Sequence, residues 1–242
     1  MRYTISDIHG EYSLFLELMN KINFSNTDEL YICGDILEKG DDSVKLAMWL
    51  FSHPNVHCIR GNHEEMFLKY YNSLMKETED YEAVLAKLQA YLGGDGYLLD
   101  WDTVEKIEAL PYYIETDDFI CVHAGVPLDK NNGIPPLETV MPEEFLYNRK
   151  FKRPDVLPAS RKCVFYGHTS SMDVYPDSRI ITYLRGEDPK SKDLKDYIKV
   201  HLDVGTSTGG WLGCFCIDTC ETYFVRKRKL IRGKKVDSER EV

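Results

Sequence analysis

Five short polar segments of this 242-residue chain carry side chains whose types suit metal-ion chemistry. In chain order they read DIHG (7–10), GDILEKG (34–40), RGNHE (60–64), HAG (123–125) and GHT (167–169). They contain four of the seven histidines, and carboxylates and an amide, which are hard oxygen ligands, stand among them. A single histidine is most often structural, so the ordered set, rather than any one motif, indicates a site.

Each polar segment follows a short run of β-prone residues that must position it. The runs are YTIS (3–6), ELYIC (29–33), VHCI (56–59), FICV (119–122) and CVFY (163–166), and a sixth, YIKVHL (197–202), precedes DVGTSTGG. Between the first runs, Leu14, Phe15 and Leu18 recur at helical spacing, and Ser43 is placed to cap a second helix. The alternation predicts an α/β fold with a largely parallel sheet, and the strand-rich last third predicts a mixed or antiparallel sheet there.

The polar segments are predicted to meet at one edge, because ligands of α/β sheets bind beyond the carboxyl ends of the strands. Two divalent ions roughly 3.5–4 Å apart need a bridging carboxylate, with nitrogen and oxygen ligands on both sides. We predict Asp35 as the bridge, Asp7 and His9 as ligands of the first ion, and Asn62, His123 and His168 as ligands of the second. Such a set without cysteine suits manganese first, with iron or zinc as alternatives.

The five motifs, in this order, resemble those of the calcineurin-like metallophosphoesterases, most closely the compact bacterial and bacteriophage serine/threonine phosphatases. The resemblance runs from Asp7 to about Gly205, where HLDVGTSTGG is similar to the family's closing strand and turn. It implies a mixed β-sandwich flanked by helices, two manganese-like ions, and hydrolysis of a phosphomonoester by metal-activated water. It also implies that His63 stays off the metals and protonates the leaving group.

Two positions depart from the family pattern, which usually has Asp-Arg where this chain has Glu38 and Lys39. Glu38 could still orient His63 through one extra methylene. Lys39 could neutralise phosphate only as a point charge, without the bidentate fork of an arginine. The segment YNRK resembles a family segment whose arginine touches phosphate, so Arg149 is a second candidate for substrate binding.

The sequence between the third and fourth motifs predicts a helical insertion at about 66–100. An apolar stripe at helical spacing, which GGDG then ends, consists of Tyr81, Val84, Leu85, Leu88, Tyr91 and Leu92. We expect a single metallophosphoesterase domain over 1–225 that contains this insertion, followed by a basic tail over 226–242.

Composition limits the partners of the chain. Lys and Arg total 30 against 40 Asp and Glu, so the formal charge of −10 disfavours nonspecific binding to nucleic acid or anionic membranes. No apolar run approaches the roughly 20 residues of a membrane span, and the start turns polar too early for a signal peptide. Seven cysteines, mostly in apolar stretches, suit reduced buried thiols better than a zinc knuckle and indicate the cytoplasm. The oligomeric state stays open.

Three functions remain open at this point. The first is a phosphatase acting on phosphoserine or phosphothreonine in a phosphorylated protein, or on a small phosphoester. The second is hydrolysis of a dinucleoside polyphosphate or a phosphodiester, because dinucleoside tetraphosphatases carry closely similar motifs. The third is a metal-bearing scaffold that has lost catalysis, which the presence of all the ligands and of His63 disfavours.

Overall fold

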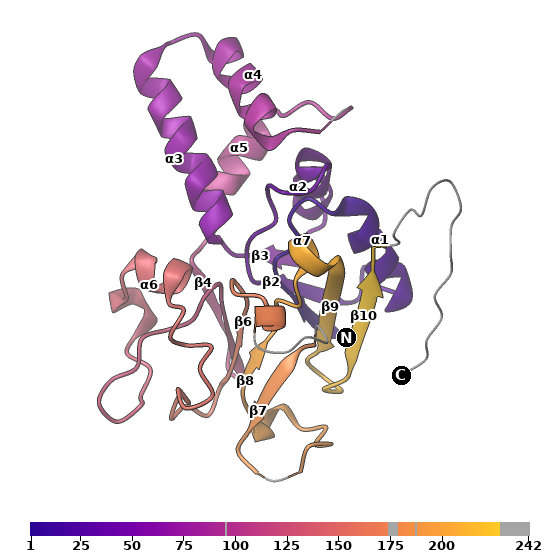
Figure 1. The fold of residues 1–242 in the computed structure, drawn as a ribbon, viewed down its shortest axis with the longest axis vertical. Coiled ribbons are helices and arrows are strands. Elements are labelled where there is room, and N and C mark those ends of the chain that lie inside the picture. Colours follow the sequence, from indigo (N-terminus) through magenta and orange to yellow (C-terminus); the bar gives the residue numbers. More distant parts are fainter. Residues whose placement is uncertain (95, 174–178, 187, 228–242) are drawn as a thin grey trace.

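Two mixed β-sheets form the centre of the protein (Figure 1). The structure is a computed structural model that describes residues 1–94, 96–173, 179–186 and 188–227. Within these residues the first sheet has the order β10 (Thr222–Arg226), β9 (Trp211–Cys216), β1 (Arg2–Ile5), β2 (Glu29–Ile32) and β3 (Val56–Cys58). The second has the order β4 (Tyr113–Glu115), β5 (Phe119–Val122), β6 (Cys163–Tyr166), β8 (Tyr197–His201) and β7 (Ile181–Leu184).

Each sheet combines parallel with antiparallel pairing. In the first sheet β1, β2 and β3 run parallel, whereas β9 and β10 pair antiparallel beside them. In the second sheet β5, β6 and β8 run parallel between antiparallel β4 and β7. All six predicted runs are therefore strands, and the mixed β-sandwich flanked by helices that the resemblance implies is confirmed.

Three apolar layers hold the sheets and helices together. The layer between the sheets contains Cys33 after β2, Phe119 and Phe165 from the second sheet, and Phe215 from β9, all fully buried. The outer face of the first sheet packs against α1 (Tyr12–Lys21) and α2 (Ser43–Phe51). The outer face of the second sheet packs against α6 (Pro142–Tyr147) and the loops beside it. Burying apolar faces from both sides is the driving force for this layered arrangement.

The prediction that Ser43 caps a helix is wrong in detail. Helix α2 begins at Ser43 and its N-cap is Asp42, which makes no side-chain cap hydrogen bond. The Ser43 hydroxyl instead accepts a hydrogen bond from the backbone N–H of Glu38 at 3.0 Å. Ser43 therefore fixes the loop that carries Glu38 and Lys39.

Helices fill the region of the predicted insertion. Helix α3 (Asn62–Glu77) and α4 (Tyr81–Leu92) lie side by side and stand away from the sheets, and α5 (Trp101–Glu108) leads back toward them (Figure 1). The predicted stripe buries Val84, Leu88 and Leu92, while Tyr91 keeps 37% of its surface exposed. The helical insertion, defined here as residues 62–108, therefore extends past both ends of the predicted segment.

The remaining elements are short. They are α7 (Thr206–Gly209) and the 3₁₀ turns Leu137–Thr139, Ser171–Asp173 and Leu194–Asp196. Cys214 and Cys216 are buried in β9. In the described part of the chain no helix combines the length and apolar character needed to cross a membrane. Of the predicted basic tail, residues 228–242 lie outside the described residues.

Candidate metal centre

The carboxyl ends of five parallel strands deliver the predicted ligands. Asp7 and His9 follow β1, Asp35 follows β2 and Asn62 follows β3, while His123 and His168 follow β5 and β6 of the other sheet. The two sheets are joined at this edge, because the backbone N–H of His168 donates to Asp7 Oδ2 at 3.0 Å. The structure therefore brings all six predicted ligands to one place.

An unusual backbone conformation marks these loops. Among the described residues nine non-glycine residues have positive φ, and six of them are candidate site residues: Asp7, His9, Asp35, Glu38, Lys39 and His168. A left-handed conformation at a non-glycine residue costs roughly 1–3 kcal/mol and persists only where surrounding contacts enforce it. Such strain concentrates at functional sites, so its distribution independently supports the location of this one.

One set of possible metal ligands contains hydrogen-bond acceptors that face one another: Nε2 of His123, Oδ1 of Asn62 and Oδ1 of Asp35. The Nδ1–H of His123 donates to the carbonyl of Cys33 at 2.8 Å, which leaves Nε2 as an acceptor. This Nε2 lies 2.9 Å from Asn62 Oδ1 and 3.3 Å from Asp35 Oδ1. His168 Nδ1 completes the set, 2.7 Å from Asn62 Oδ1 and 3.1 Å from His123 Nε2.

These spacings fit a metal ion. Ligands bound at right angles, each about 2.1 Å from one ion, lie about 3 Å apart. Nε2 of His123 and the oxygens of Asn62 and Asp35 are acceptors held this close, so they repel each other unless a cation lies among them. The set formed by Asp35, Asn62, His123 and His168 thus suits one divalent ion.

A second donor set lies on the other side of Asp35. The Nδ1 of His9 bonds the Leu37 carbonyl at 3.2 Å, which directs Nε2 toward Asp7 Oδ1 at 3.9 Å and Asp35 Oδ2 at 3.8 Å. Asp35 thus offers Oδ2 to this set and Oδ1 to the other, as a bridging ligand must. His63 Nε2 also lies 3.9 Å from Asp35 Oδ2, so distance alone allows His63 as a ligand.

The charge states of the isolated side chains also fit cations. Burial raises the pKa of Asp7 and Asp35, and the charge of Asp35 raises that of Asp7 further. Burial lowers the pKa of His9 to about 3 and that of His168 to about 2, so both imidazoles stay neutral at neutral pH. Neutral imidazoles bind metal ions, and a nearby cation would return the buried carboxyls to their charged form.

The predicted proton donor has the predicted partner. His63 Nδ1 lies 2.6 Å from Glu38 Oε2, and both side chains are half-buried. Burial disfavours the imidazolium, but the Glu38 hydrogen bond and the charge of Asp35 outweigh it and raise the pKa of His63. The Glu38 carboxylate therefore reaches His63 even though its side chain has one methylene more than an aspartate.

Both predicted phosphate-binding residues lie at the rim of the centre. The Lys39 ammonium is 3.0 Å from His9 Nε2 and so brings a positive charge to the first donor set. Arg149 is exposed and donates to the hydroxyl of Thr169, the neighbour of His168, at 3.3 Å. Either cation could meet a phosphate bound at the metals.

Glu64, a fully buried acid on α3, has a role at the site that its sequence position did not reveal. Its carboxylate accepts hydrogen bonds at 2.7–3.0 Å from the backbone N–H groups of Asp35, Ile36, Leu37 and Gly61. Gly61 packs so closely on Asp35 that a Cβ there would overlap the carboxylate. The spacing of Gly61 and Glu64, a helix N-cap with an acid three residues later, is the signal that could have revealed this contact.

A family model gives the broadest comparison with known proteins. The model described as calcineurin-like phosphoesterase matches residues 3–190. Curated relatives include a symmetrical bis(5'-nucleosyl)-tetraphosphatase of Chromobacterium violaceum, 31% identical over 127 residues that make up 51% of this chain and 43% of the relative. The enzyme of the same name from Cellvibrio japonicus is 30% identical over 127 residues, covering 52% and 45%. The chain therefore matches less than half the length of these relatives.

Solved structures share the fold at low identity. A protein provisionally described as a diadenosine tetraphosphatase aligns with a TM-score of 0.66 at 17% identity, covering 93% of this chain and 92% of that one. A Saccharomyces cerevisiae protein serine/threonine phosphatase aligns with a TM-score of 0.55 at 15% identity, covering 97% and 82%. At these identities the likeness concerns the fold alone.

Proposed function

The chain belongs to the calcineurin-like phosphoesterase family, and we propose that it hydrolyses dinucleoside polyphosphates with two divalent metal ions. The observation that carries the proposal is the cluster of facing acceptors, in which His123 Nε2 lies 2.9 Å from Asn62 Oδ1 and 3.3 Å from Asp35 Oδ1. The relatives named symmetrical bis(5'-nucleosyl)-tetraphosphatases support the substrate class. They favour it over the phosphoserine and phosphothreonine interpretation, and a small phosphoester over a phosphoprotein as the partner.

Each donor set would hold one divalent ion, and Asp35 would contribute an oxygen to both sets. Asp7 and His9 would hold the first ion, and Asn62, His123 and His168 the second. When bound, such ions would lower the pKa of a water molecule and neutralise charge on the reacting phosphate. Manganese suits this mixture of imidazole, carboxylate and amide, with iron or zinc as alternatives.

The side chains around the donor sets supply positioning and a proton. The oxygen of water forms the new bond to phosphorus while the bond from phosphorus to the leaving oxygen breaks. His63 Nε2, in the protonated ring, would give its proton to that oxygen, and the proton lost by water would then restore the imidazolium. Lys39 and Arg149 would hold the non-reacting phosphate oxygens, Lys39 as a point charge and Arg149 as a fork.

A second candidate function follows from the pairing of Glu38 with His63. A nucleotide phosphate leaves without much help from an acid, whereas an alkoxide needs a proton. The 2.6 Å hydrogen bond that supports an imidazolium at His63 therefore favours alkyl phosphomonoesters as substrates. This observation keeps monoester hydrolysis as an alternative for the same centre.

A substrate panel distinguishes the two functions. Protein freed of metal by a chelator and reloaded with manganese should be assayed with diadenosine tetraphosphate, bis(p-nitrophenyl) phosphate and glycerol phosphate. The proposal predicts the highest kcat/KM for the dinucleotide and no activity without metal. An Asp35→Asn variant purified in parallel controls for contaminating phosphatases. A tenfold preference for glycerol phosphate would favour the second candidate, and no turnover of any substrate would reject both.

We also propose that residues 1–225 act as one metallophosphoesterase domain that includes the helical insertion. The supporting observation is that α3 begins at Asn62, a candidate ligand, so the insertion starts inside the metal centre. Its first turn also carries His63 and Glu64. The insertion would therefore form part of the site as well as a cover for it.

A further inference from the structure

The carboxylate of Glu38 has two partners, and the second comes from the helical insertion. Oε2 of Glu38 accepts the hydrogen bond from His63 Nδ1 at 2.6 Å. Oε1 accepts a hydrogen bond from the hydroxyl of Tyr91 at 2.5 Å. Tyr91 lies at the end of α4, 53 residues along the chain from Glu38. A chain of two short hydrogen bonds thus joins the insertion to the predicted proton donor.

We propose that Tyr91 is a positioning residue that holds Glu38, and through it His63, in the orientation needed for proton donation. This inference rests on the proposed function, because it assigns Tyr91 a part in the same hydrolysis. If Tyr91 holds Glu38 in place, the orientation of His63 depends on the helical insertion.

The length of the Glu38 side chain explains why a second partner is needed. A glutamate has one more rotatable bond than an aspartate, so its carboxylate samples more positions unless both oxygens are held. Hydrogen bonds to a charged acceptor are the strong ones, and Tyr91 supplies one to the oxygen that His63 leaves free. Tyr91 thus restricts the conformations of the Glu38 side chain and so keeps the His63 ring in one orientation.

The Tyr91 ring is itself fixed by aromatic neighbours on α3. Its centroid lies 5.0 Å from that of Tyr70 and 6.3 Å from that of Phe67. Burial and the hydrogen bond to Glu38 raise the pKa of Tyr91, so the hydroxyl remains a donor throughout the neutral range. The hydroxyl is therefore aimed by packing as well as by its acceptor.

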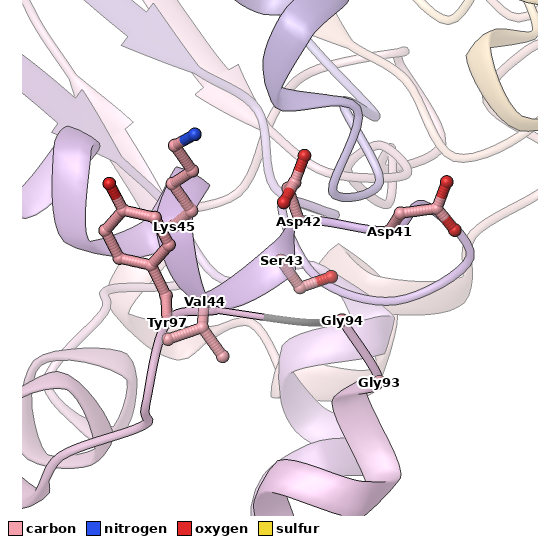
Figure 2. Close-up of a pocket in the computed structure, with 8 residues that line it drawn as sticks. All are labelled: Asp41, Asp42, Ser43, Val44, Lys45, Gly93, Gly94 and Tyr97. Atoms are coloured by element: carbon pink, nitrogen blue, oxygen red, sulfur yellow. The ribbon is translucent and has the colours of Figure 1, made fainter.

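A seam just beyond α4 joins the insertion to the loop that carries Glu38 and to the first turn of α2. Figure 2 shows Tyr97 beside Lys45, and the Lys45 ammonium lies 5.0 Å from the centroid of that ring. Gly94, at φ 87°, packs so closely on the carbonyl of Asp41 that a Cβ would overlap it. The cavity at this seam has a volume of about 10 Å³, the room of a single water molecule, so it is a packing contact and not a substrate pocket.

Kinetics of Tyr91→Phe test the inference against a matched control. Tyr70→Phe removes a hydroxyl from the same aromatic cluster without touching Glu38. We expect Tyr91→Phe to lower kcat for an alkyl phosphate about tenfold. It should lower kcat for p-nitrophenyl phosphate less, because that leaving group needs little protonation, and should leave KM and metal content unchanged. Equal losses on both substrates, or equal losses in the two variants, would overturn the inference.

A double-mutant cycle tests the length argument. Glu38→Asp shortens the side chain, so its carboxylate cannot hold His63 and reach Tyr91 together. Adding Tyr91→Phe to Glu38→Asp should then change kcat less than twofold, whereas Tyr91→Phe alone costs about tenfold. Equal effects of Tyr91→Phe in both backgrounds would show that Tyr91 acts independently of Glu38.

A measurement without substrate separates this inference from the proposed function. In the zinc-loaded protein, which is diamagnetic, NMR can follow solvent exchange of the His63 Nδ1 proton. Tyr91→Phe should accelerate that exchange about tenfold and Tyr70→Phe should not. This result in a protein that hydrolyses no phosphoester would retain the positioning contact and reject the function. Unchanged exchange in Tyr91→Phe would reject the positioning contact whatever the activity.

Discussion

Replacing Glu64 by glutamine tests whether a buried acid fixes the loop that holds the bridging ligand. Each oxygen of Glu64 accepts two backbone N–H groups: Oε2 those of Asp35 and Gly61, and Oε1 those of Ile36 and Leu37. A glutamine keeps one oxygen and replaces the other by an NH₂ group, which is itself a donor. Glu64→Gln therefore leaves two backbone N–H groups without an acceptor in a fully buried position.

The size of the effect follows from that count. A buried donor left without an acceptor costs about 1–3 kcal/mol, so two of them should lower the free energy of unfolding by about 2–6 kcal/mol. A domain of this size loses roughly 2–4 °C in Tm for each kcal/mol. We therefore expect Tm to fall by roughly 4–24 °C. Metal affinity should fall as well, because the Asp35 loop loses its anchor.

Urea unfolding with and without manganese measures both effects, and Glu65→Gln is the matched control. Glu65 is the next residue on α3, and its side chain, which is 18% exposed, pairs with Arg60 at 3.1 Å and with Lys69 at 3.6 Å. Glu65→Gln keeps an oxygen that can accept from Arg60 and leaves no backbone N–H group without an acceptor, so it should destabilise the protein less than Glu64→Gln. If the free energies of unfolding of Glu64→Gln and Glu65→Gln differed by less than 1 kcal/mol and Glu64→Gln bound manganese normally, the carboxylate of Glu64 would not hold the loop. The role assigned to Glu64 would then be wrong.

Three further predictions concern other residues of the site and its support. Lys39→Arg should raise kcat/KM for phosphomonoesters relative to diesters, since a fork grips a terminal phosphate, and an unchanged ratio would mean that residue 39 does not face the substrate. If His63 donates a proton, kcat for an alkyl phosphate should fall as pH rises through the pKa of His63. The Glu38 hydrogen bond helps to raise this pKa, so Glu38→Gln should move the fall in kcat to lower pH. A fall at the same pH in the variant and the wild type would contradict this. Lys199→Met should lower the free energy of unfolding by about 3–5 kcal/mol, because the fully buried Lys199 side chain donates to three backbone carbonyls at 2.6–2.8 Å. A thermal unfolding curve equal to that of the wild type would show that these hydrogen bonds contribute nothing.

The local part of the fold was predictable from the sequence. The runs FICV and CVFY are β5 and β6 to the residue, because each apolar stretch ends at a glycine or a polar motif. The pairing of two sheets was not predictable from such runs, since it depends on contacts between strands far apart in the chain. Strand β4 shows the limit, because its three residues, Tyr113–Glu115, are too few to produce a pattern.

The candidate ligands were predictable for a reason that the topology explains. Parallel strands end at one edge, so residues placed directly after them must meet, as His123 after β5 and His168 after β6 do. The backbone of the loops was not predictable, because nothing in the residue types of Asp35 or Lys39 requires positive φ. That conformation is imposed by contacts from elsewhere, such as those of Glu64.

The supporting residues were hidden because their sequence patterns have a commoner meaning. An acid in the first turn of a helix usually faces solvent and the helix dipole, whereas Glu64 is fully buried beneath the centre. A tyrosine in an apolar stripe usually packs, and Tyr91 does pack, but its hydroxyl reaches Glu38. Only the relative placement of distant segments reveals such contacts.

Metal stoichiometry tests the central claim most directly. Chelated protein should be equilibrated with manganese, passed through a desalting column and analysed for bound metal, with Asp35→Asn treated identically. We predict two ions per wild-type chain and loss of both from Asp35→Asn, because the bridge screens the repulsion between the cations. A wild-type chain that binds no ion, or an Asp35→Asn variant that retains two, would contradict a dinuclear centre bridged by Asp35.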